Sequence, residues 1–329
     1  MTKKEPFAIS YFLGRTFFLG FGFSLLFKIL DKDAWISSLL GILLGTFIIF
    51  IFQKIKTKYP LTTLIGKIVF FLFNFFIFTQ ILFIFETFCS SFYLIRSPNI
   101  YILFPLIFII YRITKNGFTT IFRVSEVLFP ISIILITIVC LGLLQNVNIN
   151  YFEPIFMTKP MTILEGTLYF AIYSTAPFFL LWNEDSCQKL IRPYLFSAIT
   201  VFIAATFIIA VLGPNLAQIY RYPEYMTLKK IKLFNFVEKV ENIVSIIWLF
   251  DSFITLSVSG NNLKNLLPKK HQKITFSIVL IFLFGIAIYA GNNYKEELWI
   301  YHSLPILLGI MMLLLILVSI FIKKKESTS

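Results

Sequence analysis

Apolar residues dominate the chain in ten long runs, and the short stretches between the runs carry most of the polar and charged side chains. About 20 apolar residues are needed for one helical crossing of a bilayer, and every run except the fourth comes close to that length or exceeds it. The pattern predicts an all-α integral membrane protein with ten transmembrane helices. We expect these helices at residues 7–29, 34–53, 66–95, 98–112, 119–144, 163–182, 192–214, 236–260, 274–292 and 299–322.

The composition supports the same class. Hydrophobic residues make up 58% of the chain and aromatic residues 18%, and the mean hydropathy is +0.86, which is more apolar surface than a soluble core of this size buries. No long polar linker divides the runs, so we expect residues 1–329 to form one transmembrane domain. Because nine runs follow the first and no small-residue cleavage pattern follows it, we expect the first run to be a membrane helix rather than a signal peptide.

The basic residues indicate the topology. The fourth run is short and contains Pro105, which alone suggests a re-entrant segment. If it crosses and both termini are cytoplasmic, most of the 29 Lys and Arg residues fall in inner loops, as the positive-inside rule requires. We therefore expect residues 98–112 to span the membrane. The net charge of +13 then reflects anchoring to anionic membrane lipids, and we expect no nucleic-acid binding.

Two of the runs, the first and the sixth, are interrupted by Gly or Pro. The interruptions are Leu19–Ser24 and Tyr173–Phe178, at corresponding places in the two halves of the chain. Paired interruptions of this kind point to a binding site near the middle of the membrane and to a solute-transporter fold. The predicted substrate-binding residues are Gly20, Phe21, Gly22, Ser174, Thr175 and Pro177.

The chemistry of an interrupted helix suits a zwitterion. Backbone groups that lose their partners in hydrocarbon cost several kcal/mol each, so something polar must bind them. Freed N–H groups favour a carboxylate, whereas freed carbonyl groups favour an ammonium group or a cation. The alternative is that Gly and Pro only provide packing contacts and kinks, for which they are common in membrane helices.

Ionisable residues inside the predicted helices are candidates for ion or proton coupling, because such residues are rare in membranes. Glu86 and Asp251 are the deepest carboxyl groups, and Thr255 and Ser259 follow Asp251 at helical spacing. Either acid can carry a proton, and the hydroxyl groups beside Asp251 also suit a hard cation. The alternative is a hydrogen-bonded carboxyl group with no role in transport.

Three further charged residues are predicted to form gates or ion pairs. Arg15 lies five residues before Gly20, so it can close one side of the site, pair with a carboxylate, or extend to the headgroups. Arg123 and Glu126 are three residues apart and share a helix face, which favours a structural pair.

The longest connection, at about residues 213–235, contains two prolines and then the helix-like stretch Tyr225–Lys232. We expect a short helix on the outer face that covers the site like a lid. A solvated loop that only joins two spans is the alternative.

Several segments resemble the endospore germination permeases. Tyr222–Leu228, Phe236–Glu241 and Trp248–Phe253 are similar to the family's signature region. Further similar segments are Asp33–Trp35 with Leu39–Gly41, Gly117–Pro130, and Phe152–Pro154 with Leu164–Gly166. The chain departs from the family at Lys239, where Arg is usual, and after Phe178, where a Gly-Glu pair is common.

The resemblance implies the amino acid/polyamine/organocation permease fold, with two inverted five-helix repeats at about residues 7–144 and 163–322. It also implies that the chain is the permease-like B subunit of a germinant receptor, located in the cell membrane or the inner spore membrane. The expected partners are a small nutrient such as an amino acid, a membrane subunit with large cytoplasmic domains, a lipoprotein, and membrane lipids.

No pattern in the chain is typical of an enzyme. His271 and His302 have no Cys or carboxylate at ligand spacing, and no phosphate-binding glycine loop occurs. We expect no cofactor and no metal site. Two functions remain: a germinant-sensing receptor subunit, or an ion-coupled amino acid transporter, driven by H⁺ or Na⁺, with the same fold.

Overall fold

A computed structural model describes residues 7–55, 63–95, 97–184, 189–230, 241–293 and 298–326, and all regular secondary structure in them is helical. Lys239 and residues 236–240 of the signature region lie outside the described residues. The first half contains α1 (Phe7–Leu13), η1 (Phe18–Gly22), α2 (Phe23–Leu30), η2 (Asp31–Asp33), α3 (Ala34–Ile55), α4 (Leu64–Phe92), α5 (Asn99–Asn116) and α6 (Phe118–Leu143). After η4 (Leu144–Asn146) and η5 (Ile149–Phe152) come α7 (Pro160–Thr175), η6 (Ala176–Asn183), α8 (Ile191–Leu212), α9 (Pro214–Ile219), α10 (Pro223–Leu228), α11 (Glu241–Leu266), η7 (Lys269–His271), α12 (Gln272–Asn293) and α13 (Leu298–Glu326).

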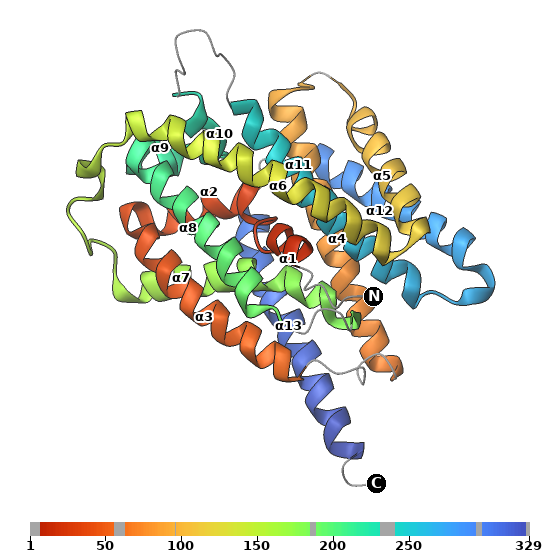
Figure 1. The fold of residues 1–329 in the computed structure, drawn as a ribbon. Coiled ribbons are helices and arrows are strands. Elements are labelled where there is room, and N and C mark those ends of the chain that lie inside the picture. The colour runs from red at the N-terminus through yellow and green to blue at the C-terminus, as the bar shows by residue number, and fades with distance from the viewer. Residues whose placement is uncertain are drawn as a thin grey trace.

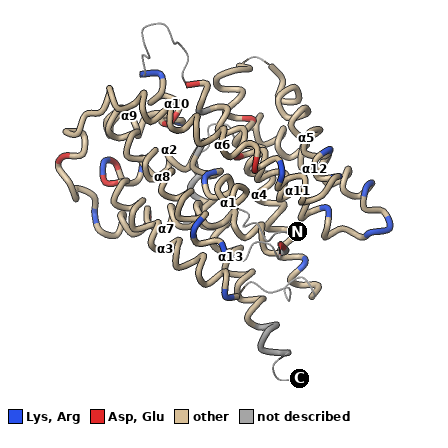
Figure 2. Tube along the Cα trace, in the orientation of Figure 1, with Lys and Arg blue, Asp and Glu red and all other residues tan. Residues whose placement is uncertain are grey.

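Eight helical segments in the described ranges are long and apolar enough to cross a membrane, which confirms the all-α membrane class. Charged residues are sparse along their ribbons (Figure 2). The segments are Gly20–Ile55, Leu64–Phe92, Phe118–Asn146, Pro160–Trp182, Ile191–Leu212, Glu241–Leu266, Lys269–Asn293 and Ser303–Ile320. Each of the ten predicted runs contains helix, but the first run is interrupted and the fourth, α5, is not among the eight, so ten crossings remain a prediction.

Small residues allow α3 to pack closely on α7 and α8. A Cβ atom at Gly41 would lie 2.7 Å from the Cβ of Phe170, and one at Gly45 would lie 1.8 Å from the hydroxyl oxygen of Tyr194. Glycines four residues apart form a flat strip on one helix face, which lets helices approach in a membrane. This contact fixes α7 and α8, and therefore the second interruption, against α3.

Amide side chains join α4 and α11 to η6 in the interior. Asn262 on α11 donates one hydrogen bond to Asn74 Oδ1 on α4, at 2.9 Å, and another to the carbonyl oxygen of Leu180 in η6, at 2.7 Å. Ser259 donates to the carbonyl oxygen of Asn74 at 2.8 Å. The bond to Leu180 brings a side-chain donor to the 3₁₀ backbone of η6, and the bonds to Asn74 join α11 to the regular helix α4.

The connection between α8 and α11 is folded into the protein. It forms the short helices α9 and α10 at the end of the bundle opposite the C-terminus (Figure 1). Tyr222, Glu224 and Leu228 are at most 6% exposed. The predicted short helix therefore exists, over Pro223–Leu228, and the burial of its side chains contradicts the alternative of a solvated loop for this part. Residues 231–240 lie outside the described ranges.

We expect Gly41→Ala to lower the free energy of unfolding by about 1–3 kcal/mol, because the added methyl group overpacks the contact with Phe170. Gly285→Ala in α12 is the matched control, since a Cβ there has nothing within 4 Å. Denaturant titration of the purified protein in detergent measures both. Equal stability of the two variants would contradict the proposed packing of α3.

Candidate functional site

The first predicted interruption is present in the structure. Helix α1 ends at Leu13, a turn follows, and the wider π-helix η1 covers Phe18–Gly22 before α2 resumes regular α-helix. Gly20 has φ +128°, a conformation that only glycine adopts readily. The Gly20 N–H is consequently turned away from the helical ladder and is available to other groups.

The second predicted interruption is a change of helix type. Helix α7 ends at Thr175, and the chain continues as the 3₁₀-helix η6. Pro177 lies in the first turn of η6, where proline is tolerated because a backbone N–H there has no partner within the helix. Ser174 Oγ lies 3.1 Å from the hydroxyl of Tyr194, and Thr175 donates to the carbonyl oxygen of Ala171 at 2.7 Å. Both side chains are fully buried.

Aromatic rings fill the space where the two interruptions meet. Phe17 stacks on Tyr173 with ring centroids 5.7 Å apart, and Phe18 lies against Phe170 at 4.7 Å. The predicted binding residues thus fall into two groups, with Gly20, Phe21 and Gly22 on one side of these rings and Ser174, Thr175 and Pro177 in the other segment.

A carboxylate that the sequence analysis missed binds the first interruption. Glu224, in the first turn of α10, accepts a hydrogen bond from the Gly20 N–H at 2.9 Å through Oε1. Its second oxygen, Oε2, is buried and has no hydrogen-bond partner among the described residues. Burial raises the pKa of this carboxyl group to about 8, and the N–H bonds it accepts offset the effect only in part.

The sequence does contain a signal for Glu224. It is the only acidic residue between Asp185 and Glu238, and it directly follows Pro223 at the start of a short helix. An isolated acid in an otherwise apolar and basic connection is a candidate for a specific partner, but acids at a helix start are also common caps.

Aromatic side chains cover this contact. Phe21 stacks on Tyr222 at 5.8 Å, and Tyr222 in turn lies edge-on to Phe88 at 5.2 Å. Phe88 also packs against Trp248 of α11 at 4.8 Å. The rings of Tyr222, Phe88 and Trp248 therefore form a continuous aromatic cluster next to Phe21 of the first interruption.

Arg15 lies in the turn just before η1 and is paired inside the protein. It is 3% exposed, and its guanidinium group forms a salt bridge with Asp251 of α11, which is fully buried. Arg15 also donates to the Tyr11 hydroxyl at 2.5 Å and to Ser132 Oγ of α6 at 3.2 Å. The predicted pairing with a carboxylate is thus the geometry observed, and the side chain does not extend to the surface.

The other coupling candidates lie in different environments. Thr255 lies 2.6 Å from the Thr16 hydroxyl, next to the Arg15–Asp251 pair, whereas Ser259 bonds to α4. Glu86 is fully buried in α4, and a Cβ at Gly291 of α12 would lie 2.2 Å from its Oε2. The structure therefore brings together Asp251 and Thr255, and places Glu86 against α12 instead.

Arg123 and Glu126 are exposed on α6. No salt bridge joins these two side chains in the part of the chain that the structure describes. Within the same ranges, no cluster of three His, Cys, Asp or Glu residues could hold a metal ion.

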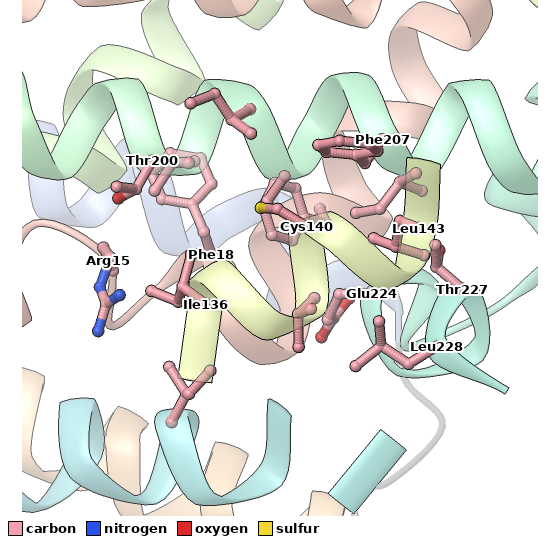
Figure 3. A pocket seen from close by; sticks show the side chains of 17 residues that line it. Arg15, Phe18, Ile136, Cys140, Leu143, Thr200, Phe207, Glu224, Thr227 and Leu228 are labelled. Carbon is pink, nitrogen blue, oxygen red and sulfur yellow. The ribbon is translucent and has the colours of Figure 1, made fainter. Parts of the chain in front are cut away.

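A cavity of about 90 Å³ lies beside the first interruption, between α6 and α8. We call it the α6–α8 cavity. Most of its lining is apolar, and its charged lining residues are Arg15 and Glu224, which lie at different places along it (Figure 3). Phe18 and Phe23 bring the first interruption to its wall, whereas no residue of the second interruption lines it.

Breaking the Arg15–Asp251 pair should be strongly destabilising. Asp251→Asn leaves a buried guanidinium group without its counter-charge, so we expect the free energy of unfolding to fall by about 3–5 kcal/mol. The double variant Arg15→Met with Asp251→Leu should recover most of this loss, and Arg123→Met at the exposed position should change little. Denaturant titration in detergent tests this, and additive losses in the double variant would contradict a direct pair.

Glu224 should give the fold a specific pH dependence. Between its ordinary pKa of 4.5 and its raised pKa of about 8, the folded state binds a proton that the unfolded state has lost. The stability contributed by this proton is therefore complete below the window and decreases as the pH rises through it. We expect thermal unfolding from about pH 5.5 to about pH 8.5 to show a steeper loss of stability in the wild type than in Glu224→Gln. Parallel pH profiles would contradict this placement.

A family model of known proteins covers most of the chain. The family model for spore germination proteins, a family of spore permeases, matches residues 9–295. No curated protein matches the chain. The matched region includes both interruptions, the short helix α10 and the Arg15–Asp251 pair. This chain therefore belongs to the spore germination protein family, and it is an integral membrane protein.

Proposed function

We propose that the chain is the permease-like subunit of a spore germinant receptor, which binds an amino acid or similar small nutrient at the interrupted helices and so triggers germination. The observation that carries the proposal is the Gly20 N–H. It is freed by the interruption, lies beside the α6–α8 cavity, and already binds a carboxylate of the protein. Interrupted helices next to a cavity are the usual place for a small polar ligand in membrane proteins of this architecture.

The Arg15–Asp251 pair gives ligand binding a route to the rest of the molecule. Arg15 lies at the start of the first interruption, and its partners belong to α6 and α11. A buried ion pair stabilises a fold little more than apolar packing does, so its presence is better explained by a switch between two arrangements. A ligand that favours one position of the interruption would move α11 through this pair.

The surrounding architecture completes the proposal. One domain of ten helices would contain two inverted repeats, at about residues 7–144 and 163–322, with both termini cytoplasmic. The signal would pass to a membrane subunit with large cytoplasmic domains and to a lipoprotein. The chain would lie in the cell membrane or the inner spore membrane.

An ion-coupled amino acid transporter is the second candidate. The fully buried carboxyl groups of Glu86 and Asp251, the latter beside Thr255, favour it, because intramembrane acids commonly form proton or cation pathways. Two assays separate the candidates: nutrient-triggered germination of a deletion strain that expresses the chain, and uptake of labelled amino acids by vesicles. Restored germination without uptake supports the receptor, whereas uptake with no effect on germination supports the transporter.

Bulky side chains at the interruptions should abolish the nutrient response. A Cβ at Gly22 would lie 2.7 Å from the carbonyl oxygen of Phe17, and Ser174 is enclosed against Tyr194. We expect Gly22→Leu and Ser174→Leu to insert into the membrane normally and to lose germination. Gly285→Leu, where a Cβ has nothing within 4 Å, should keep it. An unchanged dose response in both variants would exclude a site at the interruptions.

A further inference from the structure

The Glu224 carboxylate is held in place by one of its oxygens only. Oε1 accepts the Gly20 N–H, whereas Oε2 is buried and has no hydrogen-bond partner in the described part of the chain. The side chain is 6% exposed and lines the α6–α8 cavity (Figure 3). An isolated acceptor of this kind costs free energy until a donor reaches it.

The hydrogen bond to Gly20 decides which group of a ligand is recognised at this point. A ligand carboxylate would need the Gly20 N–H, but Glu224 already binds that donor. The ionised form of Glu224 would also repel a second carboxylate. An ammonium group instead favours the ionised form of Glu224, because an opposite charge nearby lowers the pKa of a carboxyl group; it then finds an acceptor at Oε2, and the bond to Gly20 is kept.

The remaining lining determines what the ammonium group is attached to. Besides Arg15, Glu224 and the hydroxyl residues Thr200 and Thr227, the lining of the cavity is mostly apolar, with Val139 and Leu143 of α6, Phe207 of α8 and Ile247 of α11 among its members. These side chains offer apolar contacts and no hydrogen bonds, so they favour a small aliphatic body over a polar one.

We infer that Glu224 is a specificity-determining residue that binds the ammonium group of the nutrient, so that the α6–α8 cavity takes small aliphatic primary amines, aliphatic amino acids among them. The inference rests on the proposed function and adds to it the group by which the ligand is recognised. Helix α10 then contacts the ligand directly, because Glu224 belongs to it.

The test uses L-valine and two compounds that each lack one of its charged groups: isobutylamine, which lacks the carboxylate, and 3-methylbutanoate, which lacks the ammonium group. Calorimetry measures their binding to the purified full chain in lipid nanodiscs. In the wild type, we expect L-valine and isobutylamine to bind, and 3-methylbutanoate to bind at least about 10-fold more weakly. This comparison needs no variant, so it holds even if a substitution prevents folding.

Glu224→Gln supplies the second arm, since its side-chain oxygen can still accept the Gly20 N–H. We expect it to weaken both amines by about 10-fold to 100-fold and to leave 3-methylbutanoate unchanged. Glu165→Gln is the matched control, because Glu165 is an exposed acid on α7, and it should leave all three affinities unchanged.

Four results would overturn the inference. Equal binding of 3-methylbutanoate and L-valine would show that the amine is not recognised, and tighter binding of 3-methylbutanoate to Glu224→Gln would show that Glu224 competes with a ligand carboxylate. L-valine binding that is unaffected by Glu224→Gln would reject Glu224 but keep the proposed function. If no probe binds to the wild type, the cavity assignment fails, and the germination assay decides separately whether the proposed function fails with it.

Discussion

A helix that is interrupted in an apolar interior must find new partners for its backbone, and the arrangement around the first interruption of this protein follows from that requirement. Gly20 turns its N–H out of the helical ladder, and water is not there to accept it. The acceptor is the carboxyl group of Glu224 in α10, which belongs to the connection between α8 and α11. Helix α10 is therefore bound to the first interruption through this hydrogen bond.

The same requirement explains why charged groups gather there. Arg15 lies in the turn where α1 ends, and its salt bridge with Asp251 joins the interruption to the middle of α11. Thr16 and Thr255 add a hydroxyl contact at 2.6 Å beside it. The segment from Arg15 to Gly20 thus contacts α6, α10 and α11. A small change in its conformation would therefore shift contacts with three helices. A receptor subunit needs such a connection, and so does a transporter.

The sequence predicted the class and the positions of the interruptions, and it indicated Arg15 and Asp251 as charged residues inside the membrane helices. Apolar runs, and Gly, Pro or charged residues inside such runs, are local signals that can be read from one sequence. The sequence could not reveal that Arg15 and Asp251 are partners, because they are 236 positions apart and periodicity carries no distance between helices. Glu224 was missed because it lies outside the apolar runs, in a connection where acids are ordinary. The aromatic rings between the interruptions depend on how helices pack, which composition does not fix.

The most direct test of this account is an experimental structure of the protein with a nutrient that triggers germination. The account predicts density for the nutrient in the α6–α8 cavity, against the first interruption and Glu224, with Gly20 still outside the helical ladder. A continuous first helix, or a nutrient bound away from the interruption, would contradict it.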